Sequence, residues 1–182
     1  MLEKKVVDMI KSRLGFNGRN AIILGSGLGT FANYLKNKLV FPYSEVTDFP
    51  RSTVTGHQGE LISGYHGQQQ VLVAKGRFHC YEGYDFSTVV LPIRIFNALG
   101  VRNLIITNSS GSITRSNPPG SLMAINGHFD CTFRSGPSDP ELRSDEKYHN
   151  PLMLSIAQQV AKTNVINLTQ GNYCWTLGPS YE

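Results

Sequence analysis

The sequence predicts a three-layer α/β domain, and three observations lead to that prediction. Short apolar runs typical of strands alternate along the chain with segments of helical periodicity. Glycine-containing turns separate many of these segments. The chain has 182 residues, of which 40% are hydrophobic and 16% charged, and this suits one globular domain around one core. We therefore expect residues 1–182 to form a single domain.

The first elements predicted are a helix, a strand and a second helix. Residues 2–14 carry apolar side chains at helical spacing, and Gly15 follows as a stop signal. Residues 20–24 form a short apolar run that predicts a strand, and the glycine-rich turn 25–29 follows it. Residues 30–39 are compatible with a helix. The order is strand, glycine turn, helix.

A hairpin and a helix are predicted next. Residues 61–65 and 70–74 indicate two paired strands around a tight turn at His66 and Gly67. Residues 86–99 have apolar side chains at helical spacing. Because Pro92 lies inside that pattern, we expect the helix to kink there or to be limited to its later turns.

The second half of the chain contains longer irregular stretches. Residues 103–107 predict a buried strand, and residues 122–125 predict another. Residues 126–150 are rich in Gly, Pro, Ser, Asp and Asn, and they predict a long irregular excursion of the kind that usually serves a site or an interface. Residues 151–162 predict a helix that starts at proline, and residues 173–177 predict a last strand.

Composition favours a cytoplasmic protein with an anionic small-molecule ligand. The net charge is +4, but the basic residues are dispersed and their longest run is Lys4-Lys5, which favours an anion pocket over nucleic-acid binding. The three cysteines show no C-x-x-C spacing, so neither a disulfide framework nor a zinc site is indicated, and a reducing compartment fits best. Charges interrupt the N-terminal apolar residues, and no apolar run has transmembrane length.

The glycine turn at residues 25–29 is the first candidate binding site. A turn of this kind after a strand exposes backbone N–H groups at a helix N-terminus, where a phosphate can bind. A turn without any ligand is an equal alternative. The later glycine and the acidic partner of a dinucleotide fingerprint are missing, which disfavours a dinucleotide-dependent oxidoreductase. The Lys-Ser/Thr pair of a P-loop is missing as well.

Residues 76–84 (GRFHCYEGY) combine cationic, aromatic and acidic side chains directly after an apolar strand. Arg77 can hold an anion in a fork of two N–H groups. His79 can add a donor, and Glu82 can hold its ring in the required tautomer. The alternative is a surface loop with one internal salt bridge.

Two further segments are weaker candidates. His57 lies between glycines in a loop, where it can donate to an anion, although a histidine without a function is the commoner case. Residues 107–111 (TNSSG) follow a strand with small hydrogen-bonding side chains that let a ligand approach the backbone. A plain Asn/Ser turn is the alternative for that segment.

In this order, the segments ILGSGLG, FPRSTVTGHQG, GRFHCYEGY, TNSSGS and GPSYE resemble the trimeric purine nucleoside phosphorylase family. The resemblance covers essentially all 182 residues, and the related methylthioadenosine phosphorylases are less similar. It implies a phosphorylase/hydrolase-like fold with a mixed central sheet flanked by helices. It also implies a homotrimer that uses inorganic phosphate as co-substrate, without a metal or cofactor.

The resemblance implies a phosphate site made of several segments. Ser26, Arg77, His79 and the backbone around Ser109 would bind phosphate. His57 would lie beside that phosphate and help to position it.

The resemblance also implies roles in nucleoside binding. Tyr81 would contact the ribose, and Glu82 would orient His79. Tyr181 would pack on the purine, and Glu182 would accept a hydrogen bond from its N1–H. That last contact favours 6-oxopurines such as inosine and guanosine over adenosine. His79, Glu82 and Glu182 are thus the expected catalytic residues.

The sequence departs from the family in its length, at two serines, and in the stretch around residues 126–139, which matches less well. Family members are about half as long again, and the part that follows their GPSYE segment supplies further phosphate, ribose and purine contacts. We therefore expect this chain to lack the C-terminal portion of the family, and a non-catalytic remnant that binds phosphate or nucleoside is the alternative function. In addition, Ser109 and Ser110 stand where the family commonly has two alanines.

Overall fold

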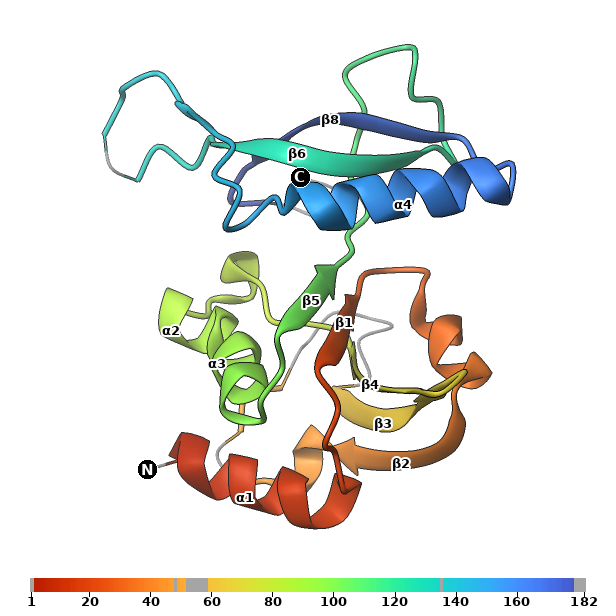
Figure 1. Cartoon of the computed structure of the whole chain (residues 1–182). Coiled ribbons are helices and arrows are strands. Elements are labelled where there is room, and N and C mark those ends of the chain that lie inside the picture. Colours follow the sequence, from red (N-terminus) through yellow and green to blue (C-terminus); the bar gives the residue numbers. More distant parts are fainter. Residues whose placement is uncertain (1, 48, 52–58, 135, 179–182) are drawn as a thin grey trace. The chain divides into compact units, whose positions relative to one another are not determined.

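The computed structural model describes residues 2–47, 49–51, 59–134 and 136–178, and the chain divides into two compact units (Figure 1). Unit 1 comprises residues 1–109 and unit 2 residues 110–182. Each unit has its own sheet, and each is described by itself below. The mixed α/β fold predicted from the sequence is confirmed, whereas the single domain stays a prediction.

Unit 1 is built on a five-stranded mixed sheet with the order β2-β3-β4-β1-β5. Strand β1 is parallel to both β4 and β5, whereas β3 is antiparallel to both β2 and β4. The strands are β1 (Asn20–Leu24), β2 (Lys36–Pro42), β3 (Glu60–His66), β4 (Gln69–Lys75) and β5 (Asn103–Ile106).

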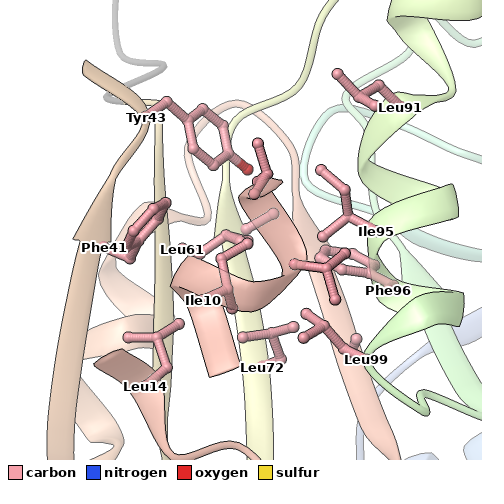
Figure 2. Packing of buried hydrophobic residues seen from close by; sticks show 14 of the residues in the cluster. Ile10, Leu14, Phe41, Tyr43, Leu61, Leu72, Leu91, Ile95, Phe96 and Leu99 are labelled. Carbon is pink, nitrogen blue, oxygen red and sulfur yellow. The ribbon is translucent and has the colours of Figure 1, made fainter. Parts of the chain in front are cut away.

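Side chains that alternate along β1 and β4 divide the core of unit 1 into two layers. On one face of the sheet, residues such as Ala21 and Leu72 pack with helices α1 (Leu2–Leu14) and α3 (Leu91–Ala98), as Figure 2 shows in part. On the other face, residues such as Val73 pack with the 3-10 helix η1 (Gly29–Tyr34). Successive side chains of a strand point to opposite faces of the sheet. Because both faces are covered here, both sets of side chains are apolar, which explains the near-continuous apolar runs in the sequence.

The predicted break in the helix at residues 86–99 is confirmed. The segment forms α2 (Phe86–Val89) and α3, with Val90 between them and Pro92 in the first turn of α3. Proline fits there because the first N–H groups of a helix have no acceptor within the helix. The short 3-10 helices η2 (Tyr43–Glu45) and η3 (Cys80–Glu82) complete the described elements of unit 1.

The predicted helix at residues 30–39 is wrong. Only η1 forms there, and the chain continues into strand β2. Asn37 has a φ of +51°, a left-handed conformation that asparagine tolerates and that ends helical geometry. Strand β2 pairs with β3, with a shift in register between Lys36 and Leu39. Pairing with β3 thus prevails over local helix propensity in this segment.

Unit 2 is a three-stranded sheet with one helix. Strand β6 (Leu122–Asp130) is parallel to β8 (Leu168–Trp175) and antiparallel to β7 (Leu142–Arg143). Helix α4 (Pro151–Thr163) lies between β6 and β8 in sequence and contacts β6. The Asn150 side chain caps α4 by accepting a hydrogen bond from the Met153 N–H at 3.1 Å.

Three sequence predictions for the second half of the chain need correction. Strand β6 extends to Asp130 and β7 forms within the segment predicted to be irregular, while β8 begins at Leu168, earlier than predicted. Strand β5 is not buried, because it lies at the edge of its sheet, and Ile105 and Ile106 are exposed.

In the part of the chain that the structure describes, no helix combines the length and apolar character that crossing a membrane requires.

Candidate functional site

The carboxyl ends of three parallel strands meet at one edge of the sheet in unit 1. The register of β1 pairs Leu24 with Lys75 of β4 and Ile23 with Ile106 of β5. The loops that begin at Gly25, at Gly76 and at Thr107 therefore leave the sheet side by side. In open α/β sheets, this edge is where ligands bind.

The glycine turn after β1 is held against the end of β5. The Leu28 N–H donates to the Gly25 carbonyl at 3.2 Å, and Gly27 has a φ of +82°, as position i+2 of a type II turn requires. The Gly25 N–H donates to the Thr107 hydroxyl at 2.9 Å, and this hydroxyl donates to the Ile23 carbonyl at 3.0 Å. A Cβ atom on Gly25 would lie 2.6 Å from the Thr107 carbonyl oxygen, so only glycine fits without a shift of backbone.

The structure changes the expected origin of the anion-binding potential at this turn. The turn leads into the six-residue 3-10 helix η1, where the sequence predicted an α-helix. Such a short helix contributes little macrodipole. The turn can still bind an anion through its own backbone N–H groups.

Arg77 and Ser109 bring the other two loops to the same place. The Arg77 guanidinium donates through Nη1 to the Thr107 carbonyl at 3.2 Å. The Ser109 hydroxyl donates to the Ser26 carbonyl at 3.2 Å. Three of the predicted phosphate residues, Ser26, Arg77 and Ser109, are thus linked through the end of β5.

The segment 76–84 is anchored by aromatic side chains. Phe78 is 2% exposed, and its ring centroid lies 6.0 Å from that of Tyr43 and 5.6 Å from that of Tyr84. These rings belong to the core layer that packs with α1 and α3. Burial of Phe78 fixes the backbone of its neighbours, and this gives Arg77 and His79 a rigid support.

His79 and Glu82 form a buried pair. His79 Nδ1 lies 2.7 Å from Glu82 Oε1, and the His79 backbone N–H donates to the same oxygen at 2.9 Å. The two side chains are only 8% and 1% exposed. Since an ionised carboxylate only accepts hydrogen bonds, we assign the proton to Nδ1. In the neutral ring, Nε2 then accepts a hydrogen bond, and in the imidazolium it donates one.

The Tyr81 ring stacks on the His79 ring, with centroids 4.6 Å apart and an angle of 18° between the planes. Stacking restrains the rotation of both rings. Together with Glu82, it fixes the plane of the imidazole. The structure therefore brings His79, Tyr81 and Glu82 into one cluster.

Three predicted site residues, His57, Tyr181 and Glu182, lie outside the described residues. The described residues on either side of 52–58 are both bonded to the segment that carries Arg77 and His79. The Tyr84 hydroxyl donates to the Arg51 carbonyl at 2.6 Å, and the Gly59 N–H donates to the Lys75 carbonyl at 3.3 Å.

Lys75 was not identified from the sequence, and Thr107 was identified only as a member of the segment 107–111. Thr107 contacts both the glycine turn and Arg77. Lys75 Nζ forms a 2.7 Å ion pair with Glu60, and its Cε lies 3.7 Å from the position that a Cβ on Gly29 would take. The sequence feature that could have pointed to Lys75 is its position directly before Gly76-Arg77.

A cavity of about 530 Å³ lies elsewhere in unit 1, at the amino end of β1, and it contains none of the predicted site residues. Lys11, Arg19 and residues 15–18 contribute to its lining. We favour the carboxyl edge of the sheet as the functional site because three of the predicted phosphate residues, Ser26, Arg77 and Ser109, meet there. Among the described residues, no group of three or more His, Cys, Asp or Glu side chains is arranged to hold a metal ion.

Comparison with known proteins gives concordant results for family and fold. Residues 19–182 match the family model described as the phosphorylase superfamily. The chain is 36% identical to purine nucleoside phosphorylase 1 of Geobacillus stearothermophilus over 187 residues, which cover 98% of this chain and 68% of that protein. It is 30% identical to purine nucleoside phosphorylase of Rattus norvegicus over 191 residues, which cover 98% of this chain and 66% of that protein.

Solved structures extend the similarity to the whole fold. The purine nucleoside phosphorylase of Schistosoma mansoni in complex with inosine gives a TM-score of 0.85 at 33% identity, over 100% of this chain and 68% of that one. A purine nucleoside phosphorylase in complex with ribose-1-phosphate gives a TM-score of 0.84 at 35% identity, over 99% of this chain and 71% of that one. The chain thus spans about two thirds of the length of these relatives.

Proposed function

The chain belongs to the phosphorylase superfamily, and on that premise we propose that it is a purine nucleoside phosphorylase. Such an enzyme is a pentosyltransferase that uses inorganic phosphate to cleave the N-glycosidic bond of a purine nucleoside. One observation carries the proposal: Arg77 is hydrogen-bonded to the end of β5 at Thr107, which also holds the glycine turn. A cation and a backbone turn suited to an oxyanion are thereby fixed together.

Phosphate binds at the carboxyl edge of the sheet in this proposal. The N–H groups and hydroxyl at Ser26 and the backbone around Ser109 surround its oxygens, and Arg77 supplies the charge. His79 contributes Nε2, which accepts from a protonated phosphate oxygen or donates to an ionised one. His57 completes the group, and the hydrogen bonds of Arg51 to Tyr84 and of Gly59 to Lys75 support that role, because Tyr84 ends and Lys75 directly precedes the segment that carries Arg77 and His79.

The reaction needs no covalent protein nucleophile. A phosphate oxygen forms a bond to C1′ of the sugar as the bond from C1′ to the purine nitrogen breaks, and the electron pair leaves with the base. The sugar carries cationic character in the transition state, and the bound phosphate dianion stabilises it. The protein contributes position and electrostatic stabilisation, which are large effects when the donors are fixed in advance.

Nucleoside recognition is assigned to three residues. Tyr81 contacts the ribose, and its stacking on His79 supports this role because the stack holds sugar and phosphate sites together. Tyr181 packs on the purine, and the Glu182 carboxylate accepts a hydrogen bond from N1–H. Adenosine has no proton on N1, so 6-oxopurine ribonucleosides and deoxyribonucleosides are the proposed substrates. A site built around a substrate N–H discriminates strongly against analogues that lack it.

The wider context is proposed from the family alone. Phosphate is a co-substrate, and we assign no cofactor and no metal to the reaction. We propose a homotrimer that acts in purine salvage in the cytoplasm and binds neither nucleic acid nor membrane. The dispersed positive charges of the chain support an anionic small molecule as ligand.

The test is phosphate-dependent release of hypoxanthine from inosine. We expect equal amounts of hypoxanthine and ribose 1-phosphate, and no release when phosphate is omitted. Release without phosphate would identify a hydrolase, and folded protein that releases nothing in phosphate would contradict the proposal.

Arg77→Ala should raise the KM for phosphate about 10- to 150-fold, because a hydrogen bond to a charged group contributes about 1.5–3 kcal/mol. Arg102→Ala is a matched control: this arginine precedes the opposite, amino end of β5 and donates to the Val101 carbonyl. It should leave the KM unchanged. Equal effects of the two substitutions would contradict the phosphate role of Arg77.

A further inference from the structure

Two of the three cysteines lie against each other in unit 2. The sulfur atoms of Cys131 and Cys174 are 2.6 Å apart, although 43 positions separate the residues in sequence. Even carbon atoms, which are smaller than sulfur, reach their best unbonded separation at about 3.5–4.0 Å. A disulfide requires about 2.05 Å, so about half an ångström of movement would bring the sulfurs to bonding distance.

Strand register explains why these side chains meet. Strands β6 and β8 run parallel and side by side (Figure 1), and Cys174 is paired with Phe129. Cys131 follows Phe129 by two positions, and alternation places side chains two positions apart on the same face of a sheet. Cys131 and Cys174 therefore share a face.

The backbone at Cys131 is fixed on both sides. Its N–H donates to the Trp175 carbonyl at 2.8 Å, which joins it to the residue after Cys174. The Asp130 carboxylate accepts from the Thr132 N–H at 3.1 Å and from the Thr132 hydroxyl at 2.6 Å. The turn thus formed encloses Cys131 and holds its sulfur toward β8.

Both sulfurs can be reached by a dissolved oxidant. Cys174 is exposed and Cys131 is half-buried. Unit 2 also has few buried residues: among those described, only Gly127, Thr132 and Ala161 are buried. Folded units with small cores are often stabilised by disulfides.

We propose that Cys131 and Cys174 form an intramolecular disulfide when the protein meets a small disulfide oxidant such as oxidised glutathione. Cys131 attacks one sulfur of the oxidant as a thiolate, and its proton leaves to solvent. A mixed disulfide forms, and one glutathione leaves as thiolate. Cys174 then loses its proton and attacks the Cys131 sulfur, which releases the second glutathione. The two protein thiols lose two electrons and two protons, and the two glutathione thiols gain them.

The order of attack follows from the environment of Cys174. Its hydrogen bond to Cys131 and, to a lesser extent, burial raise the pKa of Cys174 to about 11. A thiol that donates to the neighbouring sulfur keeps its proton while this hydrogen bond lasts, and the thiolate is the reactive form. Once the Cys131 sulfur is bonded, this hydrogen bond is lost and Cys174 becomes the attacking group.

The test counts thiols in the whole chain before and after treatment with oxidised glutathione. Free thiols should fall from three to one per chain, and digestion without reduction should give one cross-linked peptide pair that contains Cys131 and Cys174. Cys80 lies in unit 1, so Cys80→Ser is the matched control and should reduce the count from two to zero with the same peptide pair.

Variants Cys131→Ser and Cys174→Ser should give no cross-link within the chain while their reduced forms keep the wild-type circular dichroism spectrum. Persistence of three free thiols, a cross-link that includes Cys80, or dimers on a non-reducing gel in place of the internal bond would each overturn the proposal.

Discussion

Replacing Gly25 with alanine should separate the strand ends that form the candidate phosphate site. A Cβ there would lie 2.6 Å from the Thr107 carbonyl oxygen and 2.8 Å from the Asn108 Cα. Both contacts are with backbone, so no side-chain rotation can relieve them. Gly25 is not among the residues with positive φ, so the cost of alanine is steric and not conformational.

The magnitude follows from the required displacement. Restoring ordinary contact requires a shift of about 0.5–1 Å, and overpacking of this kind typically costs about 1–3 kcal/mol. For a chain of this size, this cost lowers Tm by roughly 2–12 °C. The shift also lengthens the hydrogen bonds from Gly25 and Arg77 to Thr107, now 2.9 and 3.2 Å. Misplacement by about 1 Å can cost about 10²-fold in catalysis, so the KM for phosphate should rise at least about 10-fold.

Thermal unfolding and phosphate saturation kinetics measure the two effects. Gly29→Ala is the control, because the nearest atom to its new Cβ would be Lys75 Cε at 3.7 Å, an ordinary contact. We expect its unfolding free energy to change by less than about 0.5 kcal/mol. If Gly25→Ala and Gly29→Ala share the same Tm and the same KM for phosphate, the strand ends do not touch as described and the reasoning fails.

Three further predictions concern titratable and sulfur-containing groups. Glu82→Ala removes the carboxylate that accepts from His79 Nδ1, a buried hydrogen bond that contributes about 1–3 kcal/mol, so kcat/KM should fall about 5- to 150-fold. Glu82→Gln should restore much of the activity, because its amide oxygen still accepts. Burial, followed in size by the nearby His149 and Arg143, lowers the pKa of His128 from its ordinary value of 6.5. His128 is therefore protonated more readily in the unfolded protein, and the free energy of unfolding should fall as pH drops below about 6.5. The free energy of unfolding of His128→Gln should depend less on pH across pH 5–8. Oxidation of Cys131 and Cys174 should raise the unfolding free energy by up to about 4 kcal/mol in urea titrations, since the bond closes a loop of about 43 residues; no gain would show that the bond strains the folded state.

Local patterns predicted the parts of the fold whose structure is decided locally. The hairpin of β3 and β4 was evident because an apolar run, a short turn and a second apolar run lie close in sequence. Strand β2 was missed because its formation depends on pairing with β3 and on the left-handed Asn37. The second half of β6 was missed because its residues are polar and its partner β8 lies 40 or more positions away.

The same distinction applies to the candidate site. Ser26, Arg77 and His79 were identified because each belongs to an unusual local motif. The contact of the Thr107 hydroxyl with Gly25 was not predicted, because it spans 82 positions and depends on the parallel register of β1 and β5. The pair of Cys131 and Cys174 could not be predicted for the same reason, since only the register of β6 and β8 brings these sulfurs together.

The uneven distribution of buried residues predicts that the chain opens in stages. Among the described residues, nearly all buried hydrophobic side chains belong to unit 1, the unit that contains the candidate phosphate site, whereas unit 2 has only three buried residues. Regions with few buried contacts unfold locally at low free-energy cost. Amide hydrogens of β6 and β8 should therefore exchange with solvent long before those of β1 and β4. Phosphate binding by unit 1 should persist under conditions in which unit 2 is already partly unfolded.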